Sequence, residues 1–319
     1  MKKLFIRFAF WAFIALVIAI TLGALFSDYH KTIELISSIS MKWLWLIIIS
    51  VLFNYLLRFL KWQYFLKLLR LEVPLKLSLW VFFSAFTMVL SPAKLGELVK
   101  SMLLKSRLNI PLAETAPIVL AERVTDLLGM LLLCIIGFSQ TSFGGNAILS
   151  VGLLILAGTW AITQDWFWNL IQKLINRFYS LRKLSNPAKT LQNSTKNLLS
   201  LKSLVLTVPL STLSWAGEGV ALYLIFRATG LDLPGLLGLS IFAHAFSSIA
   251  GAVSFLPGGL LVAEGAMGAL FIYAQIPNES AVTATFLIRV LTLWFAVVLG
   301  TIVFAVGHTP GDLKECQIG

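Results

Sequence analysis

The chain has 319 residues, of which 58% are hydrophobic and 12% are charged, and its formal net charge is +11 at neutral pH. So little charge on so much apolar sequence excludes a sizeable soluble domain and predicts a polytopic membrane protein, with one integral membrane domain over residues 1–319. Because the basic excess is concentrated in loops, membrane orientation and contact with anionic lipid headgroups explain it better than nucleic acid does.

The first predicted element is an uncharged run from Phe8 to Ser27, which follows a basic N-terminus. A run of about 20 residues can cross a membrane and is longer than the apolar part of most secretory signals, so we interpret it as a retained first span. The second span is expected from Trp43 to Tyr64. Arg58 and Lys61 stand near its end, where their long side chains could snorkel to water.

The next apolar segment, Leu77 to Leu90, is interrupted because it ends at Ser91-Pro92. Proline removes a backbone donor and breaks a helix. In lipid, a broken backbone survives only where protein or a water-filled cavity covers it. We therefore expect a broken or re-entrant element that lines a site. Charged residues at near-helical spacing follow this break: Lys94, Glu97 and Lys100.

Full spans are then predicted from Ala116 to Phe138 and from Ala147 to Thr163. The first of them contains Glu122, Arg123 and Asp126 within one helical turn. Spacings of three and four residues put the first two side chains each within reach of the third. The plain alternative is an ion cluster at the cytoplasmic end of the span whose members satisfy one another.

From Asp165 to Lys202 the chain changes character, because basic residues outnumber acids and aromatic residues are interleaved with them. This pattern is typical of an amphipathic segment at a membrane surface. Counting Lys and Arg in the short loops predicts that this basic loop, residues 165–202, is cytoplasmic. Alternation of the spans then predicts both termini in the cytoplasm, in the cell (inner) membrane of a prokaryote.

Two further spans are predicted, from Ser203 to Phe226 and from Ser280 to Val306. Each of them holds one charge within its apolar run, Glu218 in the first and Arg289 in the second. Together with the earlier segments, they predict an all-α polytopic membrane protein of about six full spans plus two broken or re-entrant helical hairpins.

The second interrupted segment lies between these two spans. It is uncharged from Leu233 to Ala263, and Glu264 follows directly. Two glycines next to a proline add backbone freedom that a plain span does not need, so we again expect a break that lines a site. A tight loop between two ordinary spans is the alternative. The break itself is Pro257, Gly258 and Gly259.

The two interrupted segments belong to a predicted internal repeat, with unit one over about residues 43–138 and unit two over about residues 203–306. In each unit the proline of an Ile-Pro dipeptide stands twelve residues before the arginine of an Arg-Val dipeptide, at Pro111 and Arg123 and again at Pro277 and Arg289. Because the units are expected to enter from opposite sides, the repeat has inverted topology, which points to a transport site near the bilayer midplane. Chance similarity of two apolar segments is the alternative.

Charges inside spans are expensive, so they are expected to face a cavity or one another. Glu264 and Arg289 lie on consecutive segments and could pair across such a cavity. Arginine matches phosphate geometry better than lysine does, and a helix N-terminus after the second break offers free backbone donors to an anion. The candidate substrate-binding residues are Lys94, Glu97, Lys100, Glu122, Arg123, Asp126, Glu218, Pro257, Gly258, Gly259, Glu264 and Arg289.

Neither a metal site nor a catalytic centre is predicted. The cysteines and histidines are too far apart in the sequence to form a ligand cluster. The motifs of serine hydrolases, zinc proteases, P-loop proteins and dinucleotide-binding enzymes are missing. We therefore expect no enzyme activity and no cofactor, and we interpret His244, inside an apolar run, as a packed, hydrogen-bonded histidine.

Three motifs, PAKLGELVK at 92–100, ERVTDL at 122–127 and PGGLLVAE at 257–264, together resemble one family. It is the lysylphosphatidylglycerol synthase transmembrane-region family, the flippase-like membrane half of multiple peptide resistance proteins. The resemblance extends over about residues 43–306. The family usually has arginine where Lys100 stands and glycine where Leu261 stands. Its full synthases also carry a soluble aminoacyl-transferase domain, for which this sequence has no counterpart, so lysyl transfer is not expected of it alone.

The resemblance implies lipid translocation. We expect a flippase-like transporter that moves an anionic, aminoacylated or polyprenyl-linked lipid between leaflets. Arg123 and Arg289 would hold phosphate, while Glu97 and Glu264 would pair with them as the site alternates. The alternative is a non-transporting membrane subunit that scaffolds an envelope glycosyltransferase or lipid-modifying enzyme through its basic loop. A lipid-dependent transferase is a third hypothesis, disfavoured by the lack of a donor site.

Overall fold

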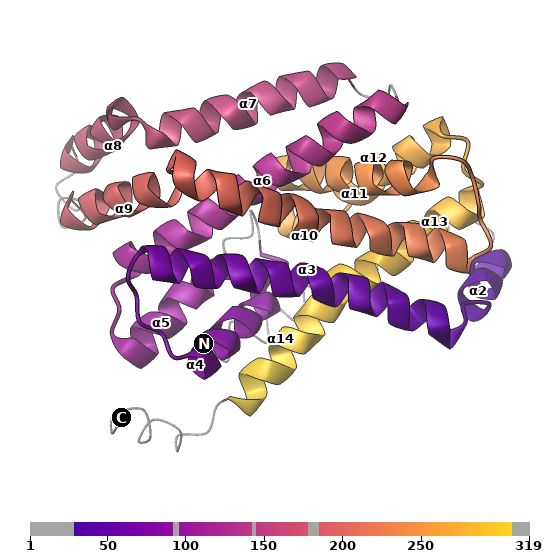
Figure 1. Cartoon of the computed structure of the whole chain (residues 1–319), viewed down its shortest axis with the longest axis horizontal. Coiled ribbons are helices and arrows are strands. Elements are labelled where there is room, and N and C mark those ends of the chain that lie inside the picture. The colour runs from indigo at the N-terminus through magenta and orange to yellow at the C-terminus, as the bar shows by residue number, and fades with distance from the viewer. Residues whose placement is uncertain (1–28, 92–95, 142–144, 178–184, 308–319) are drawn as a thin grey trace.

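The computed structural model describes residues 29–91, 96–141, 145–177 and 185–307 (Figure 1). Within these ranges the chain forms helices joined by turns and short loops, and these ranges contain no strand. The all-α fold predicted from the sequence is therefore confirmed.

The elements follow one another with short connections. In the first half they are α2 (Tyr29–Ser37), α3 (Met41–Leu68), α4 (Leu75–Ser84), the 3-10 helix η1 (Ala85–Met88), α5 (Val99–Leu108), α6 (Leu112–Thr141) and α7 (Gly145–Thr163). In the second half they are α8 (Asp165–Arg177), α9 (Ser185–Leu198), α10 (Leu201–Ala228), α11 (Leu236–Val253), the 3-10 helix η4 (Pro257–Gly259), α12 (Val262–Tyr273), α13 (Asn278–Arg289), the π-helical η5 (Val290–Trp294) and α14 (Phe295–Val306).

Proline marks the start of α4, α6 and α13. Pro74 and Pro277 occupy the N-cap positions of α4 and α13, and Pro111 immediately precedes α6. A proline there costs no intrahelical hydrogen bond, because the first N–H groups of a helix have no partner within it. The two Ile-Pro dipeptides therefore place the arginines that follow them at equivalent depths in α6 and α13.

Within the described ranges, four helices are long and apolar enough to cross a membrane: α3, α10, α11 and the continuous helix Asn278–Val306. A fifth span arises if α7 and α8 are counted together across a bend of 70°. α6 has 30 residues but carries Glu122, Arg123 and Asp126. The exact number of six full spans is not established, and the predicted first span, Phe8 to Ser27, lies outside the described residues.

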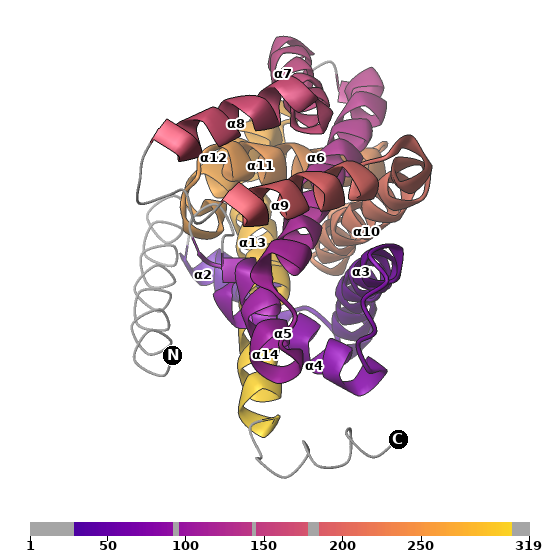
Figure 2. The same ribbon diagram turned by 90° about the vertical axis from the view of Figure 1, so that its left-hand side faces the viewer.

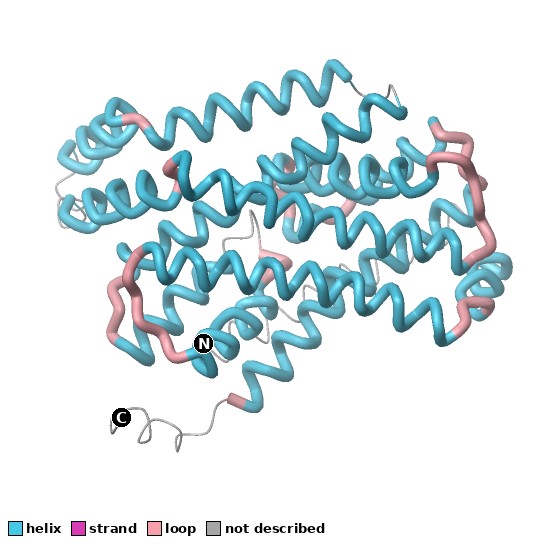
Figure 3. Tube along the Cα trace, viewed as in Figure 1, coloured by secondary structure: helices cyan, strands magenta, loops and turns pink. Residues whose placement is uncertain are grey.

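The loops gather at two opposite ends of the molecule, apart from short segments inside the bundle (Figure 3). One end holds the loop between α3 and α4 and the turn between α5 and α6. At this same end α8 and α9 cross in front of the other helices (Figure 2). The opposite end holds α2 and the loops that follow α10 and α12. The basic loop predicted over residues 165–202 thus supplies two helices that cover one end of the bundle.

α4 with η1 forms the first hairpin together with α5. The two arms pack against each other, and their outer ends lie at the end of the molecule that α8 and α9 cover. The inward arm tightens into the 3-10 turn of η1 and continues through Val89, Leu90 and Ser91. The predicted break at Pro92 and the candidate residue Lys94 lie outside the described residues.

α11 and α12 form the second hairpin, whose outer ends lie at the opposite end of the molecule. Between them the helix stops after Val253, and a 3-10 turn forms at Pro257–Gly259. Gly258 and Gly259 are buried. The interruption predicted at Pro257 is therefore confirmed, and its two glycines are packed against other helices while Phe255, Leu256 and Pro257 beside them are exposed.

α3, α6 and α10 pack together at the centre of the bundle. α6 crosses α10 closely at Gly129, where an added Cβ atom would stand 2.8 Å from the backbone nitrogen of Thr212. Small residues permit such approaches where the lipid provides no hydrophobic force to drive helices together. Large apolar side chains such as Phe53 and Leu56 of α3 are exposed, as expected of surfaces that face lipid.

Candidate functional site

The inner end of the first hairpin meets the break of the second. A Cβ atom added to Gly258 of η4 would stand 2.7 Å from Cδ2 of Leu90 and 3.4 Å from Cδ2 of Leu293. Leu90 follows η1, at the inner end of the first hairpin, and is buried. Because a side chain does not fit at Gly258, the tip of the second hairpin lies directly against the inner end of the first.

The backbone of the second break depends on unusual dihedral angles. Gly258 and Gly259 have φ values of +61° and +67°, which glycine adopts at no steric cost. Leu261, the N-cap of α12, has φ 69° and ψ −44°, a conformation that is rare for a residue with a side chain. A glycine at this position would adopt it readily, so the leucine introduces backbone strain where α12 begins.

Glu264 and Arg289 form an ion pair beside this break. Glu264 lies in the first turn of α12, and Arg289 is the last residue of α13. Nε of Arg289 lies 2.5 Å from Oε1 of Glu264, and Nη2 donates to the carbonyl oxygen of Gly258 at 2.7 Å. One guanidinium therefore connects α13 both to the break and to the helix that follows it. The pairing expected from the sequence is present, and its role in binding stays a prediction.

A second, larger group of charges lies beside the first break. We call it the Glu97 cluster, and its side chains come from α3, α6, α5 and the turn that precedes α5. Six of its seven side chains are buried, and Arg123 is partly exposed. Its members are Arg58, Lys61, Glu97, Lys100, Glu122, Arg123 and Asp126.

Arg123 of α6 joins two acids of this cluster. Its Nη2 atom lies 3.0 Å from Oε2 of Glu97 and 3.1 Å from Oδ2 of Asp126. The contact with Asp126 is the one expected from their spacing on the helix. The contact with Glu97 matches the Glu264–Arg289 pair, because in both cases a glutamate after a break pairs with the arginine of the next Arg-Val dipeptide.

Lys100 of α5 lies between two glutamates. Its Nζ atom is 3.5 Å from Oε2 of Glu97, and it also pairs with Glu122. The same ammonium group stands over the rings of Trp62 and Phe82, at 4.9 and 5.2 Å from their centroids. An ammonium over aromatic faces is attracted by their quadrupoles, and this attraction is stronger when the group is desolvated. The lysine that replaces the family's usual arginine is thus fully engaged.

Arg58 and Lys61 do not snorkel, and the interpretation made from their position near a helix end is wrong. Both are buried and point into the Glu97 cluster. Nη2 of Arg58 lies 3.3 Å from Oε1 of Glu97. Nζ of Lys61 donates to Asp126 at 2.5 Å, to Ser211 at 2.7 Å and to Thr125 at 3.2 Å. Their separation by one helical turn was the available signal that they share a face of α3.

α3 also links the Glu97 cluster to the second half of the chain. The hydroxyl of Tyr55, one helical turn before Arg58, donates to the carbonyl oxygen of Thr292 at 2.8 Å. Thr292 lies in the π-helical η5, which begins directly after Arg289. π-Helical turns are often found at functional sites. Tyr55 therefore connects the Glu97 cluster to the π-helical turn that follows Arg289.

Glu218 forms a separate pair with His244. Oε2 of Glu218 on α10 lies 3.2 Å from Nε2 of His244 on α11, and both side chains are buried. Glu218 also interacts electrostatically with Arg58. The histidine is packed and paired as predicted, although its Nδ1 atom has no hydrogen-bond partner among the described residues.

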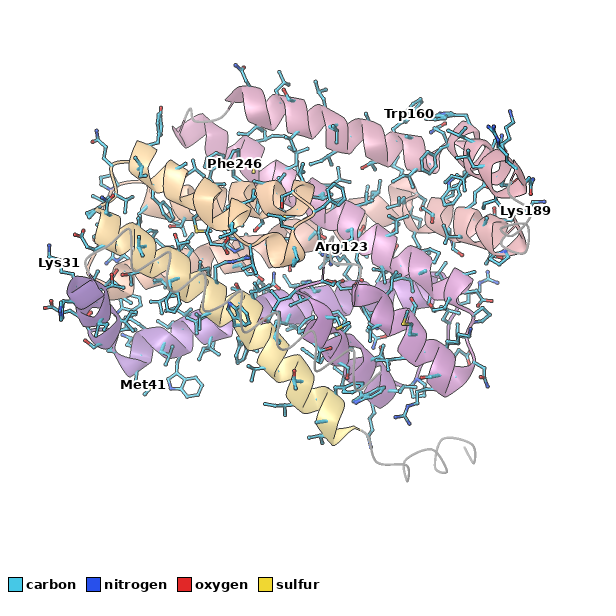
Figure 4. The ribbon with its side chains drawn as sticks, turned by 180° about the vertical axis from the view of Figure 1, so that it is seen from behind. Lys31, Met41, Arg123, Trp160, Lys189 and Phe246 are labelled. Carbon is cyan, nitrogen blue, oxygen red and sulfur yellow. The ribbon has the colours of Figure 1, made fainter. Side chains whose placement is uncertain are left out.

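Few charges of this interior are open to a ligand. The side chain of Arg123 is 21% exposed, and those of Arg289 and Glu264 are 18% and 23% exposed, whereas that of Glu97 is 2% exposed. Nε of Arg123 and Oε2 of Glu264 are buried without a hydrogen-bond partner among the described residues. Figure 4 shows Arg123 near the middle of the molecule's length. Charges within a membrane are expected to face a cavity or a ligand, because lipid would not solvate them.

The described residues contain no group of three or more His, Cys, Asp or Glu side chains that could hold a metal ion. Guanidinium and carboxylate groups beside the breaks can bind phosphate and amine groups through charge-assisted hydrogen bonds.

Comparisons with known proteins identify the family of this chain. The sequence profile of the lysylphosphatidylglycerol synthase transmembrane region matches residues 12–300. The chain is similar to a UPF0104 membrane protein of Methanocaldococcus jannaschii, with 29% identity over 67% of this chain and 91% of that protein. It is similar to a UPF0104 membrane protein of Pyrococcus horikoshii, with 23% identity over 91% of this chain and 95% of that protein. No solved structure matches.

The profile match extends over both hairpins, the Glu97 cluster and the Glu264–Arg289 pair. It also contains the three motifs that carry the resemblance seen in the sequence, while its named relatives are membrane proteins. The chain belongs to the lysylphosphatidylglycerol synthase transmembrane-region family.

Proposed function

We propose that this protein moves a lipid with a phosphate-bearing headgroup between the two leaflets of the cell membrane. The observation that carries the proposal is the meeting of two hairpins that enter the bundle from opposite ends, at Leu90 and Gly258. A glutamate–arginine pair lies beside each break. Broken helices in corresponding positions of two halves are the pattern of transporters with a midplane site.

Each arginine has a role in this proposal. Arg123 and Arg289 bind the phosphate, since a guanidinium presents paired donors that match phosphate oxygens. Glu97 and Glu264 neutralise the arginines while no lipid is bound, and the phosphate then competes for the same donors. The headgroup moves through the polar interior, while its acyl chains remain in the lipid.

The two hairpins act as halves of an inverted repeat in this mechanism. The end of the molecule covered by α8 and α9 (Figure 2) faces the cytoplasm in this proposal, because these two helices carry Lys173, Arg177, Lys189 and Lys196. The first hairpin then enters from the cytoplasm and the second from outside. Rocking of one half against the other would open the site to each leaflet in turn.

The test is translocation by purified protein in liposomes that carry fluorescent phosphatidylglycerol, an aminoacylated phosphatidylglycerol or a polyprenyl phosphate. Outward movement is measured by accessibility to an impermeant quencher and is normalised to folded protein. We expect faster translocation of at least one of these lipids than in protein-free liposomes. Arg289→Lys retains the charge but loses the fork of donors, so we expect it to reduce translocation about tenfold or more while the protein remains folded.

Glu264→Gln removes the charge that neutralises Arg289 and should also impair translocation. If both variants accumulate and translocate normally, this pair is not the site, and Glu122, Arg123 and Asp126 become the candidates. If wild-type protein moves none of the three lipids, the outcome favours a non-transporting subunit that scaffolds an envelope glycosyltransferase or lipid-modifying enzyme. Exposed Trp166, Leu170 and Leu174 of α8 would then be the contact surface to examine.

A further inference from the structure

A basic groove lies at the end of the bundle that α8 and α9 cover, apart from both glutamate–arginine pairs. It has a volume of about 740 Å³ and lies between the end of α3 and the corner where α9 meets α10. Its cations are Lys67, Arg70 and Lys202, and Asn193 and Asn197 add amide groups to its wall. No acidic side chain lines it among the described residues.

The three cations are available to an anion. None of them forms an ion pair with a described residue, in contrast to the basic side chains of the Glu97 cluster. A smaller groove shares Lys67 and Arg70 and includes Glu72, which lines that groove and not the larger one. Three cations without an acid in one groove attract a phosphate, and amide N–H groups can complete its hydrogen bonds.

The groove continues an apolar surface. On α3, large exposed side chains recur every three or four residues, and the series continues through Tyr64 to Lys67. On α10, Lys202 lies one turn before exposed Val205 and Leu206. α3 and α10 pack side by side, with Asn54 donating to Ser214 midway along them. The apolar series on α3 is Leu46, Ile49, Phe53, Leu56 and Leu60.

The part of this apolar surface that is nearest the groove is long enough for one lipid leaflet. The helix rises by roughly 16 Å from Leu56 to Lys67, at about 1.5 Å per residue. That is about half of a hydrocarbon core of roughly 30 Å. Tyr64 stands at the boundary, where tyrosine is enriched because one end of its side chain is apolar and the other is polar. A soluble phosphate would use the cations and leave the apolar surface unused.

We propose that this groove binds the headgroup phosphate of an anionic phospholipid whose acyl chains lie along α3 and α10. The site is distinct from the translocation site, and its occupancy does not depend on the proposed transport. It retains one lipid at the basic end of the bundle and thereby defines the depth at which α3 and α10 sit in the membrane. Binding is measured on protein at rest, so a failure of translocation leaves this proposal open to its own test.

The experiment measures lipid binding to the purified full-length protein in detergent by native mass spectrometry. The probes are dioleoyl phosphatidylglycerol, dioleoyl phosphatidylcholine and sn-glycerol 3-phosphate, which has the phosphate but no acyl chains. We expect phosphatidylglycerol to bind about tenfold more tightly than phosphatidylcholine. Glycerol phosphate should neither bind in the same range nor displace the lipid.

The variant Lys67→Gln/Arg70→Gln/Lys202→Gln should lose about tenfold or more in affinity for phosphatidylglycerol. Its matched control, Lys105→Gln/Lys173→Gln/Lys189→Gln, removes the same charge from exposed positions outside the groove. The control should remain within about threefold of the wild type. The single variants Lys67→Gln and Lys202→Gln provide the same comparison should the triple variant fold poorly.

Three outcomes would overturn the proposal. Equal losses of affinity for phosphatidylglycerol in the groove variant and its control would show that the overall positive charge of the surface, rather than a specific site, attracts the lipid. Equal affinity for phosphatidylglycerol and phosphatidylcholine would show that the groove does not recognise the anionic charge of the headgroup. Binding of glycerol phosphate as tightly as the lipid would identify a site for soluble phosphate instead.

Discussion

Gly258 leaves no room for a side chain against Leu90, because a Cβ atom there would stand 2.7 Å from the Leu90 Cδ2 atom. This contact joins two hairpins that are far apart in the sequence and that enter the bundle from opposite ends. Arg289 of one glutamate–arginine pair donates to the carbonyl oxygen of Gly258, and Glu97 of the other pair follows Leu90 by seven residues. Both pairs are therefore linked to the segments that make this contact.

Replacing Gly258 with alanine should separate these hairpins. The Cβ atom meets Leu90, and φ of +61° is unfavourable for any residue with a side chain. We expect a loss of about 2 kcal/mol in stability, measured by thermal unfolding in detergent. Gly268→Ala is the control, since no atom beyond the adjacent residues and backbone of its own helix lies within 4 Å of a Cβ atom there. Leu90→Ala should partly compensate in the double variant, and additive losses would argue against direct contact.

The protein with leucine at position 261 should be less stable than a variant with glycine at this position. Its φ of 69° costs an L-residue roughly 1–2 kcal/mol, part of which is offset by the greater freedom of glycine in the unfolded chain. Leu261→Gly is therefore expected to exceed Leu261→Ala in stability by about 1 kcal/mol. Both variants remove the exposed side chain, so their difference isolates the backbone. A more stable alanine variant would mean that the strain is absent.

Lys61 should stabilise the fold, because its ammonium group donates three hydrogen bonds to side chains inside the bundle. Lys61→Met leaves Asp126 without its closest cation, and breaking a buried pair in this way costs about 3–5 kcal/mol. Lys61→Met/Asp126→Asn removes the uncompensated charge and should recover part of that loss. Thermal unfolding of the two variants side by side is the measurement. Equal destabilisation in both would show that the pair contributes little.

The orientation of the molecule can be tested at Lys31 and Lys189, which lie at opposite ends (Figure 4). Both side chains are exposed. Single cysteines at these positions, in a background with Cys134→Ser and Cys316→Ser, are treated with an impermeant maleimide in intact cells. We expect labelling at position 31 without permeabilisation and at position 189 only after it, because the basic end faces the cytoplasm. The reverse pattern would invert the proposed topology.

The interruption at Pro257–Gly259 was predictable because it depends on local backbone chemistry. Proline and glycine act on their own residues and nearest neighbours, wherever the rest of the chain lies. The matched Ile-Pro and Arg-Val dipeptides were informative for the same reason, since proline begins α6 and α13 and the helical rise then sets the depth of each arginine. The Glu264–Arg289 contact could be anticipated as one possible pairing, because the two residues lie on consecutive elements.

The sequence by itself determined the helical membrane fold, the second helix break and the charged side chains that had to find partners. The tertiary structure decided which partners they found. The positions of Arg58 and Lys61 near the end of α3 are compatible both with snorkelling and with burial. They are buried because α3 packs against α6 and α10. The contact of Leu90 with Gly258 joins residues far apart in the chain. Such contacts depend on how helices are rotated and packed against each other, and spacing along one helix does not specify that geometry.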